Sequence, residues 1–403
     1  MSDMSSTTDR LVVDLLDPEL YRTNPHETWA WMRANEPVYR DGRNGLWGIT
    51  RHADIMEVER RSNVFVSGQG YRAVWSPDEI NMIAQDDPRH RQQRMLVQHK
   101  FTRAEVNDRR PEIDALVAEL LDAIVPEPGA AGECELVESM AGQLPARLTA
   151  RLLGYPESMW PEIKSWSERL MRIDMRERDG HTFVEFMDAN MEFMGGLGEV
   201  VKDKIGCPAD DLLSVWLHAR IEGQPLPPAA IAHEVGLFIS GGAETTRTAI
   251  SHGIRELCNR PDQWEALAAD PSLAPGAVEE LLRWVTPLNN MFRRAVADAD
   301  VNGTTIHRGD RIVLLYPSAN RDEAVFTDPF TFDIRRSPNP QISFGFGTHL
   351  CVGNNLARAT LQSLLIQMPA RLRDLRPITE PDVEPNIFAR AVRTFHLGFT
   401  ART

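Results

Sequence analysis

The sequence predicts a mainly α-helical protein that carries small β-sheets. Apolar residues recur at helical spacing along residues 112–125, 144–153 and 229–259. The last of these stretches is long enough for a rod of about 45 Å, which crosses a whole domain. Shorter stretches typical of strands occur at residues 38–49, 298–305 and 395–400, and these supply the small sheets.

Composition and charge exclude several classes of function. The chain has 403 residues and a formal net charge of −14, which argues against nucleic acid as a general partner. Its four cysteines are scattered and form no Cys-x-x-Cys pair, as expected in a reducing compartment. The N-terminus lacks an apolar signal core, and no run of about 18 apolar residues occurs. We therefore expect a cytoplasmic protein without a membrane anchor, with residues 1–9 disordered.

The N-terminal third alternates short helices with a hairpin and a long loop. Asn24 and Pro25 read as the N-cap and first residue of a helix. A β-hairpin is predicted for residues 38–49, and a helix for residues 53–60. Residues 67–85 read as a long loop, and loops of that length in compact domains are often functional.

A basic helix is predicted to start at residues 86–88. His90 and Arg94 are four residues apart, so they share one face of that helix. More positive charge comes from Arg89, Arg91, Lys100 and Arg103. The simplest interpretation, preferred for Arg89 and Arg91, is a solvated helix face. The alternative is that all four residues form a docking face for an acidic electron-transfer partner.

Methionine is concentrated in residues 159–206, a region predicted to be helical. Methionine packs adaptably around apolar groups of varied shape. The simplest interpretation places these side chains in the core: Met159, Met171, Met175, Met187, Met191 and Met194.

The centre of the long predicted helix breaks local rules. Gly241 and Gly242 each cost about 1 kcal/mol relative to alanine in a helix interior. Glu244 lies beside Thr245, and a buried acid is costly unless it has a partner. A close helix crossing would explain the glycines but not the acid. A plain alternative remains, in which Thr245 bonds to a helical carbonyl and Glu244 pairs with Arg247 on the surface.

Residues 343–358, SFGFGTHLCVGNNLAR, form the most distinctive stretch. Gly345 and Gly347 permit positive φ and a close approach of backbone to a ligand. Cys351 precedes a helical run that begins near Asn354, where the helix N-terminus favours a thiolate. Such a cysteine can bind a metal, act as a nucleophile or be an inert buried thiol.

The pattern formed by Phe344, Gly345, Gly347, His349, Cys351 and Gly353 resembles the haem-binding loop of cytochrome P450 enzymes. The resemblance implies a single triangular cytochrome P450 domain over residues 10–403, with a long central helix. It implies haem b (iron protoporphyrin IX) as the cofactor and Cys351 as its axial iron ligand, a thiolate that favours O–O cleavage.

Further motifs in the family's order extend the resemblance from about residue 12 to residue 400. It implies that the haem propionates are held by His90, Arg94, Arg293 and His349. It also implies an oxygen-binding groove in the long helix, where Gly241 leaves room beside the iron. Glu244 is then the acid, where many members carry aspartate, and Thr245 is the alcohol.

Glu280 and Arg283 are three residues apart and share a helical face. Alone, such a pair is usually a surface pair worth about 0.5 kcal/mol or less. In the family it is a buried structural pair completed by a downstream arginine, for which Arg321 and Arg335 are the candidates. The resemblance also makes residues 67–85 the roof of the pocket and residues 159–206 its lid helices, and brings Phe388 and Ala389 back to the pocket.

The resemblance implies a monooxygenase that hydroxylates an apolar small molecule (a steroid, terpenoid or lipid-like compound) with O₂. Residues 284–291, 318–326 and 347–354 look most like those of actinobacterial sterol side-chain and lipid hydroxylases. No flavin or iron–sulfur segment is visible, so the expected electron donors are a separate ferredoxin and ferredoxin reductase.

Three other functions compete with this one. A peroxide-driven hydroxylase would not need Glu244 and Thr245. A non-catalytic haem sensor would not need an acid and an alcohol inside a glycine-broken helix. A hydrolytic dyad of Cys351 and His349 would leave His90, Arg94 and Arg293 without a role.

Overall fold

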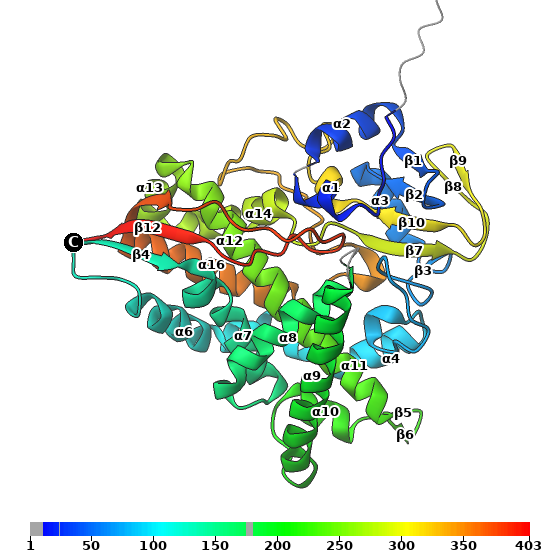
Figure 1. The fold of residues 1–403 in the computed structure, drawn as a ribbon, viewed down its shortest axis with the longest axis horizontal. Helices are drawn as coiled ribbons and strands as arrows, with labels where there is room; N and C mark the ends of the chain where they lie inside the picture. The colour runs from blue at the N-terminus through cyan, green and yellow to red at the C-terminus, as the bar shows by residue number, and fades with distance from the viewer. Residues whose placement is uncertain (1–10, 24, 175–179) are drawn as a thin grey trace, which may run out of the picture.

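The structure is a computed structural model that describes residues 11–23, 25–174 and 180–403. The predicted disorder of residues 1–9 and the expectations for Asn24 and Met175 lie outside the described residues. The single domain over residues 10–403 stays a prediction. Figure 1 shows helices filling most of the molecule, with one larger sheet at the side near the N-terminal helices.

The larger sheet has five strands in the order β1-β2-β10-β7-β3. Its hairpin pairs β1 with β2 antiparallel, which confirms the predicted hairpin, while β10 runs parallel to β2. The strands are β1 Val38–Asp41, β2 Leu46–Ile49, β3 Phe65–Val66, β7 Met291–Ala295 and β10 Arg311–Leu314. The helices beside it are α1 Pro18–Arg22, α2 His26–Asn35, α3 His52–Arg60 and α15 Tyr316–Ala319.

Two local predictions near this sheet were wrong. Pro25 is the N-cap of α2 rather than its first residue. Residues 298–305 form a hairpin of β8 (Ala299–Val301) and β9 (Thr304–Ile306), because Asn302 and Gly303 both take positive φ and turn the chain. Arg293, which precedes this hairpin, lies inside β7, where it pairs with Ile312 of β10.

The long central helix is present but has a wider turn at its middle. α11 (Pro228–Ile239) leads into a π-helical turn at Ser240–Glu244, and α12 (Thr245–Cys258) continues from it. A π-turn inside an α-helix is frequent at functional sites. A Cβ atom on Gly242 would lie 2.9 Å from Oγ1 of Thr149, so a neighbouring helix requires this glycine.

The remaining helices surround α11 and α12, and the largest apolar core cluster joins α12 to α14 and α16. In Figure 1 the molecule tapers toward α9 and α10. These helices are α4 Arg89–Val97, α5 Arg103–Asp108, α6 Arg110–Asp122, α7 Gln143–Leu153, α8 Trp160–Leu170, α9 His181–Gly206, α10 Leu212–His218, α13 Pro261–Ala269, α14 Ala274–Val285 and α16 Asn354–Arg371. None of the helices in the described part of the chain has the length and hydropathy of a membrane span.

Three smaller sheets complete the fold. One has the order β11-β12-β4, and its middle strand confirms the predicted C-terminal strand. A short hairpin joins β5 to β6, and the third sheet is the β8–β9 hairpin. The bounds are β4 Ala131–Glu135, β5 Arg220–Ile221, β6 Gln224–Pro225, β11 Leu372–Pro377 and β12 His396–Ala401.

The methionine-rich helices are only partly buried. Met171 is buried, but Met187, Met191 and Met194 on α9 are 42% to 63% exposed. The core interpretation was therefore wrong for these three. α9 is held to α8 by its other face, where the rings of Trp166 and Phe193 lie 5.9 Å apart.

Candidate active site

One cavity of about 360 Å³ joins the residues that the sequence singled out. It extends from the Cys351 loop to residues 71–83 of the predicted roof loop, so that loop does cover the cavity. Its walls are mainly apolar, as in most small-molecule sites, and include Leu148, Leu237, Phe238, Leu288 and Phe388. Ala389 is held nearby by a β-bridge to Leu288.

The cysteine loop is shaped by two glycines in the left-handed region. Gly345 has φ 71° and Gly347 has φ 69°. A Cβ atom on Gly347 would lie 2.6 Å from the carbonyl oxygen of Glu59, so only glycine fits there. The turn closes when the Cys351 N–H donates to the Phe344 carbonyl at 2.9 Å, and α16 begins three residues later.

The thiol of Cys351 lines the cavity. Its burial raises the pKa of the thiol, while a hydrogen bond from the Gly353 N–H and the charges of Arg94 and Arg358 act in the opposite direction. Arg358 also lies 4.6 Å above the ring of Phe344. The thiol therefore faces the cavity in surroundings that supply one N–H donor and two cations.

Four basic side chains line the same cavity: His90, Arg94, Arg293 and His349. The rings of His90 and His349 lie 4.1 Å apart. Burial, followed by the charges of Arg293, His90 and Arg94, lowers the pKa of His349 to about 2. Its buried Nδ1 atom has no hydrogen-bond partner among the described residues.

The two arginines of this group are short of anionic partners. Arg94 donates to the Leu350 carbonyl at 2.7 Å, and forms no ion pair within the part of the chain that the structure describes. Arg293 approaches one carboxylate, Oε1 of Glu59, at 3.4 Å. Burial raises the pKa of Glu59 to about 7, against the opposing effects of Arg293 and Tyr316. The buried guanidinium of Arg293, the half-buried guanidinium of Arg94 and an unpaired imidazole nitrogen are a donor set that fits the two carboxylates of a haem group.

The central helix reaches the cavity at its π-turn. Gly241, Gly242 and Thr245 all line the wall. No atom lies within 4 Å of a Cβ placed on Gly241, so packing does not require this glycine. The hydroxyl of Thr245 donates to the Gly241 carbonyl at 2.6 Å, which is the helical back-bond of the plain alternative.

Glu244 lies inside the protein. It is wholly buried and pairs with Arg247, which is 1% exposed, so this pair is not on the surface. Arg247 also pairs with Glu168, and Glu168 in turn lies 3.6 Å from Arg393. Oε1 of Glu244 has no partner among the described residues. A series of alternating charges thus extends from the π-turn to Glu168 on α8 and to Arg393, which precedes β12.

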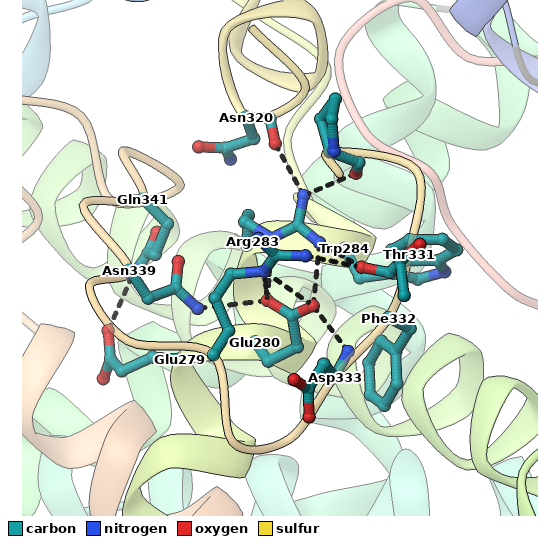
Figure 2. Close-up of polar contacts among 12 residues, drawn as sticks. Glu279, Glu280, Arg283, Trp284, Asn320, Thr331, Phe332, Asp333, Asn339 and Gln341 are labelled. Carbon is teal, nitrogen blue, oxygen red and sulfur yellow. Dashed lines mark hydrogen bonds and ion pairs between the residues drawn. The ribbon is translucent and has the colours of Figure 1, made fainter. Parts of the chain in front are cut away.

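The Glu280–Arg283 pair is buried, and neither predicted arginine completes it. Both side chains are wholly buried, and Arg283 donates to Glu280 at 2.7 and 2.8 Å, as Figure 2 shows. The third member is Arg336, whose Nε lies 3.1 Å from Glu280. Arg321 instead donates to the carbonyls of Arg283 and Trp284, and the side chain of Arg335 is exposed. Two adjacent arginines in a loop present different faces, which the sequence alone does not distinguish.

Of the four basic residues predicted to share a solvated or docking face, Lys100 does not belong to it. Lys100 is 7% exposed and pairs with Asp210, so it is not part of a solvated surface. Arg91 and Arg103 are exposed, and Arg89 is half-buried. Sequence reasoning also missed Glu59, which is buried beside Arg293. Its only signal was an acid near the end of an amphipathic helix, a pattern that usually marks a solvated residue.

Comparisons with known proteins agree with this geometry. The Cytochrome P450 family model matches residues 175–386. A steroid C26-monooxygenase of Mycobacterium tuberculosis is 37% identical, over 93% of this chain and 92% of its own length. A linalool 8-monooxygenase of Pseudomonas putida is 32% identical, over 89% of this chain and 92% of its own length. The structure of a cytochrome P450 of Mycobacterium marinum, solved in complex with pseudoionone, superposes with a TM-score of 0.86 at 30% identity. The match covers 97% of this chain and 99% of that one.

The fold and the cysteine loop define a haem-thiolate protein. The chain belongs to the cytochrome P450 family, and its class of activity is monooxygenation with a haem-thiolate iron cofactor. The resemblance read from the sequence is therefore confirmed.

Proposed function

We propose that the protein hydroxylates an apolar small molecule of the steroid, terpenoid or lipid class, using haem b, O₂ and electrons from a ferredoxin and its reductase. One observation carries this proposal: a single apolar cavity has the Cys351 thiol, Gly241 and the Thr245 hydroxyl on its wall. The names of the steroid- and linalool-oxidising relatives support the substrate class. The four free cysteines support the cytoplasm as the compartment.

Cys351 is the residue proposed to hold the haem iron through its thiolate. The Gly353 N–H stabilises its thiolate, and the ring of Phe344 packs against the guanidinium of Arg358. The propionates are assigned to the four basic side chains His90, Arg94, Arg293 and His349. When bound, haem iron supplies the activation of O₂.

Thr245 and Glu244 are proposed to deliver protons to the cavity. The Thr245 hydroxyl faces the cavity and both donates and accepts, so it can exchange its bond to the Gly241 carbonyl for one to a ligand. Glu244, its neighbour on the π-turn, is tied to Arg247 and through it to Glu168. Glu168 is 17% exposed, so this series of charged groups links the π-turn to solvent.

The test is a reconstituted assay that measures NADH consumed, product formed and peroxide released. Thr245→Ala should keep haem and substrate binding but convert more of the NADH into peroxide. Glu244→Gln should slow NADH consumption as a whole, because proton supply is limited.

Thr248→Ala is the matched control. Its hydroxyl is buried on the same helix, has no partner among the described residues and does not belong to the cavity wall. We expect this variant to keep the parent's product yield. Parent-like yield and rate in both Thr245→Ala and Glu244→Gln would contradict the proposed proton roles.

A further inference from the structure

The roof of the cavity carries a group of polar side chains within otherwise apolar walls. Tyr71, Arg72, Glu79 and Asn81 come from the loop, and His233 comes from α11. Tyr71, Arg72 and Asn81 all donate to Oε1 of Glu79, at 2.6, 3.2 and 3.0 Å. The donors of these three side chains are therefore bound to Glu79 rather than directed at a ligand.

His233 is held in one tautomer by the roof loop. The Ile80 N–H donates to Nδ1 of His233 at 3.2 Å. A backbone N–H can only donate, so Nδ1 must carry a lone pair, and the proton of the neutral ring is on Nε2. Next to it, the Met82 N–H donates to Oε1 of Glu234 at 2.9 Å. These two bonds fix the loop against α11 and fix the orientation of the imidazole.

The Nε2–H of His233 is therefore a preorganised donor. His233 lines the cavity, and Nε2 makes no hydrogen bond to any residue in the described ranges. An apolar ligand that fills the cavity displaces water from this donor, so a ligand that brings an acceptor to this point is favoured over one that does not.

The local charge selects the kind of acceptor. Arg72 faces two carboxylates, at 3.1 Å to Glu79 and 4.0 Å to Asp174. Burial raises the pKa of Asp174 to about 6, against the opposing charge of Arg72, so Asp174 is mainly ionised at neutral pH. Two anions outnumber one cation here, and a ligand carboxylate would be repelled.

We propose that His233 Nε2–H binds a neutral oxygen, a ketone or a hydroxyl, at the end of the substrate away from the oxidised carbon. The inference rests on the proposed function and narrows its substrate class to apolar molecules with one such oxygen. His233 precedes Gly241 by eight residues on a continuous helical stretch, a separation of about 12 Å along the helix axis. The ligand oxygen and the oxidised carbon should therefore lie at opposite ends of the substrate.

The experiment titrates the haem-loaded protein with matched ligands and follows the shift of the haem absorption band. The pairs are a 3-keto steroid with its 3-deoxy analogue, a terpenoid ketone with its hydrocarbon, and a long-chain fatty acid with its methyl ester. The parent should bind the ketone of at least one pair about three- to tenfold more tightly, the ratio expected for one net hydrogen bond. It should also bind the ester more tightly than the acid.

His233→Asn separates ligand binding from loop anchoring. The Asn Oδ1 takes the place of Nδ1 and still accepts from Ile80, but the side chain is too short to supply a donor at the Nε2 position. Its ketone preference should fall to about onefold, while the deoxy analogue binds as in the parent. His307→Asn, at a side chain 67% exposed on the surface, is the control and should keep the preference.

Equal binding of every ketone and its hydrocarbon by the parent would overturn the inference, whatever the variants do. A preference retained in His233→Asn, or a fatty acid bound more tightly than its ester, would also overturn it. If no ligand of any pair binds, the inference fails as well. A normal carbon-monoxide band in the same sample would then show that the haem-thiolate assignment still stands.

Discussion

The identity of the arginine that completes the buried Glu280–Arg283 cluster leads to a sharp prediction. Arg336→Ala should destabilise the protein, whereas Arg335→Ala should not. The two variants remove the same side chain and the same charge from adjacent positions. Of these two arginines, Arg336 is the one that contacts Glu280, and it also donates to the carbonyls of Thr327, Asp328 and Thr331, at 2.6, 3.1 and 2.8 Å.

The size of the effect follows from what each truncation leaves behind. Glu280 keeps Arg283 and the N–H of Asp333, so it is not stranded when Arg336 is shortened. The variant loses the charge-assisted contact to Glu280, worth about 1.5–3 kcal/mol, together with the three bonds to carbonyls. The side chain of Arg336 is 10% exposed, so water reaches some of the freed carbonyls and we expect about 2 kcal/mol. Arg335→Ala should fall within about 0.5 kcal/mol of the parent.

The assay is urea unfolding of the haem-loaded protein, with haem absorbance and far-ultraviolet dichroism followed together. Arg283→Ala marks the upper limit at about 3–5 kcal/mol, because it removes one partner of a buried ion pair. Equal losses in Arg335→Ala and Arg336→Ala, or a neutral Arg336→Ala, would refute the assignment of Arg336 as the third member.

Three further predictions test other parts of the structure. Arg293→Ala and Arg94→Ala should each raise the fraction of haem-free protein after purification, and unchanged occupancy in both would remove the propionate assignment. Burial raises the pKa of Glu234 to about 8. Folding therefore takes up a proton between about pH 5 and pH 8, and stability falls as pH rises. In urea titrations, Glu234→Gln should reduce the slope of the free energy of unfolding against pH by up to about 1.4 kcal/mol per pH unit. An unchanged slope would contradict Glu234 as the source of this pH dependence. Reversing the charges of the exposed Arg91 and Arg103 should slow reduction by a ferredoxin at low salt, and an unaffected rate would leave them as a solvated surface.

Much of the fold was predictable because its signals are local. Helical apolar spacing predicted α7 and α12, and the glycines and cysteine of residues 343–358 predicted the loop before α16. The errors came from tertiary context. The Asn302–Gly303 turn divides a stretch that otherwise alternates like one strand, and Arg336 was missed because a loop's path decides which arginine faces inward.

The site followed the same division. The candidate site residues placed by motif spacing line one cavity, apart from Glu244, which is buried in an ion-pair network. Long-range contacts explain what was missed. Glu59 approaches Arg293 across 234 residues, and Ile80 approaches His233 across 153. No local pattern records such pairs. Composition alone also did not show that Met187, Met191 and Met194 would be exposed on α9.

The most direct test of the central assignment is the absorption spectrum of the reduced, carbon-monoxide-bound protein, recorded for the parent and for Cys351→His. The parent should show the thiolate-type band, and Cys134→Ser, Cys207→Ser and Cys258→Ser should keep it. Cys351→His should lose that band even where haem remains bound, because imidazole is a neutral ligand. A colourless parent, or a thiolate-type band that persists in Cys351→His, would contradict the assignment of Cys351 as the haem ligand.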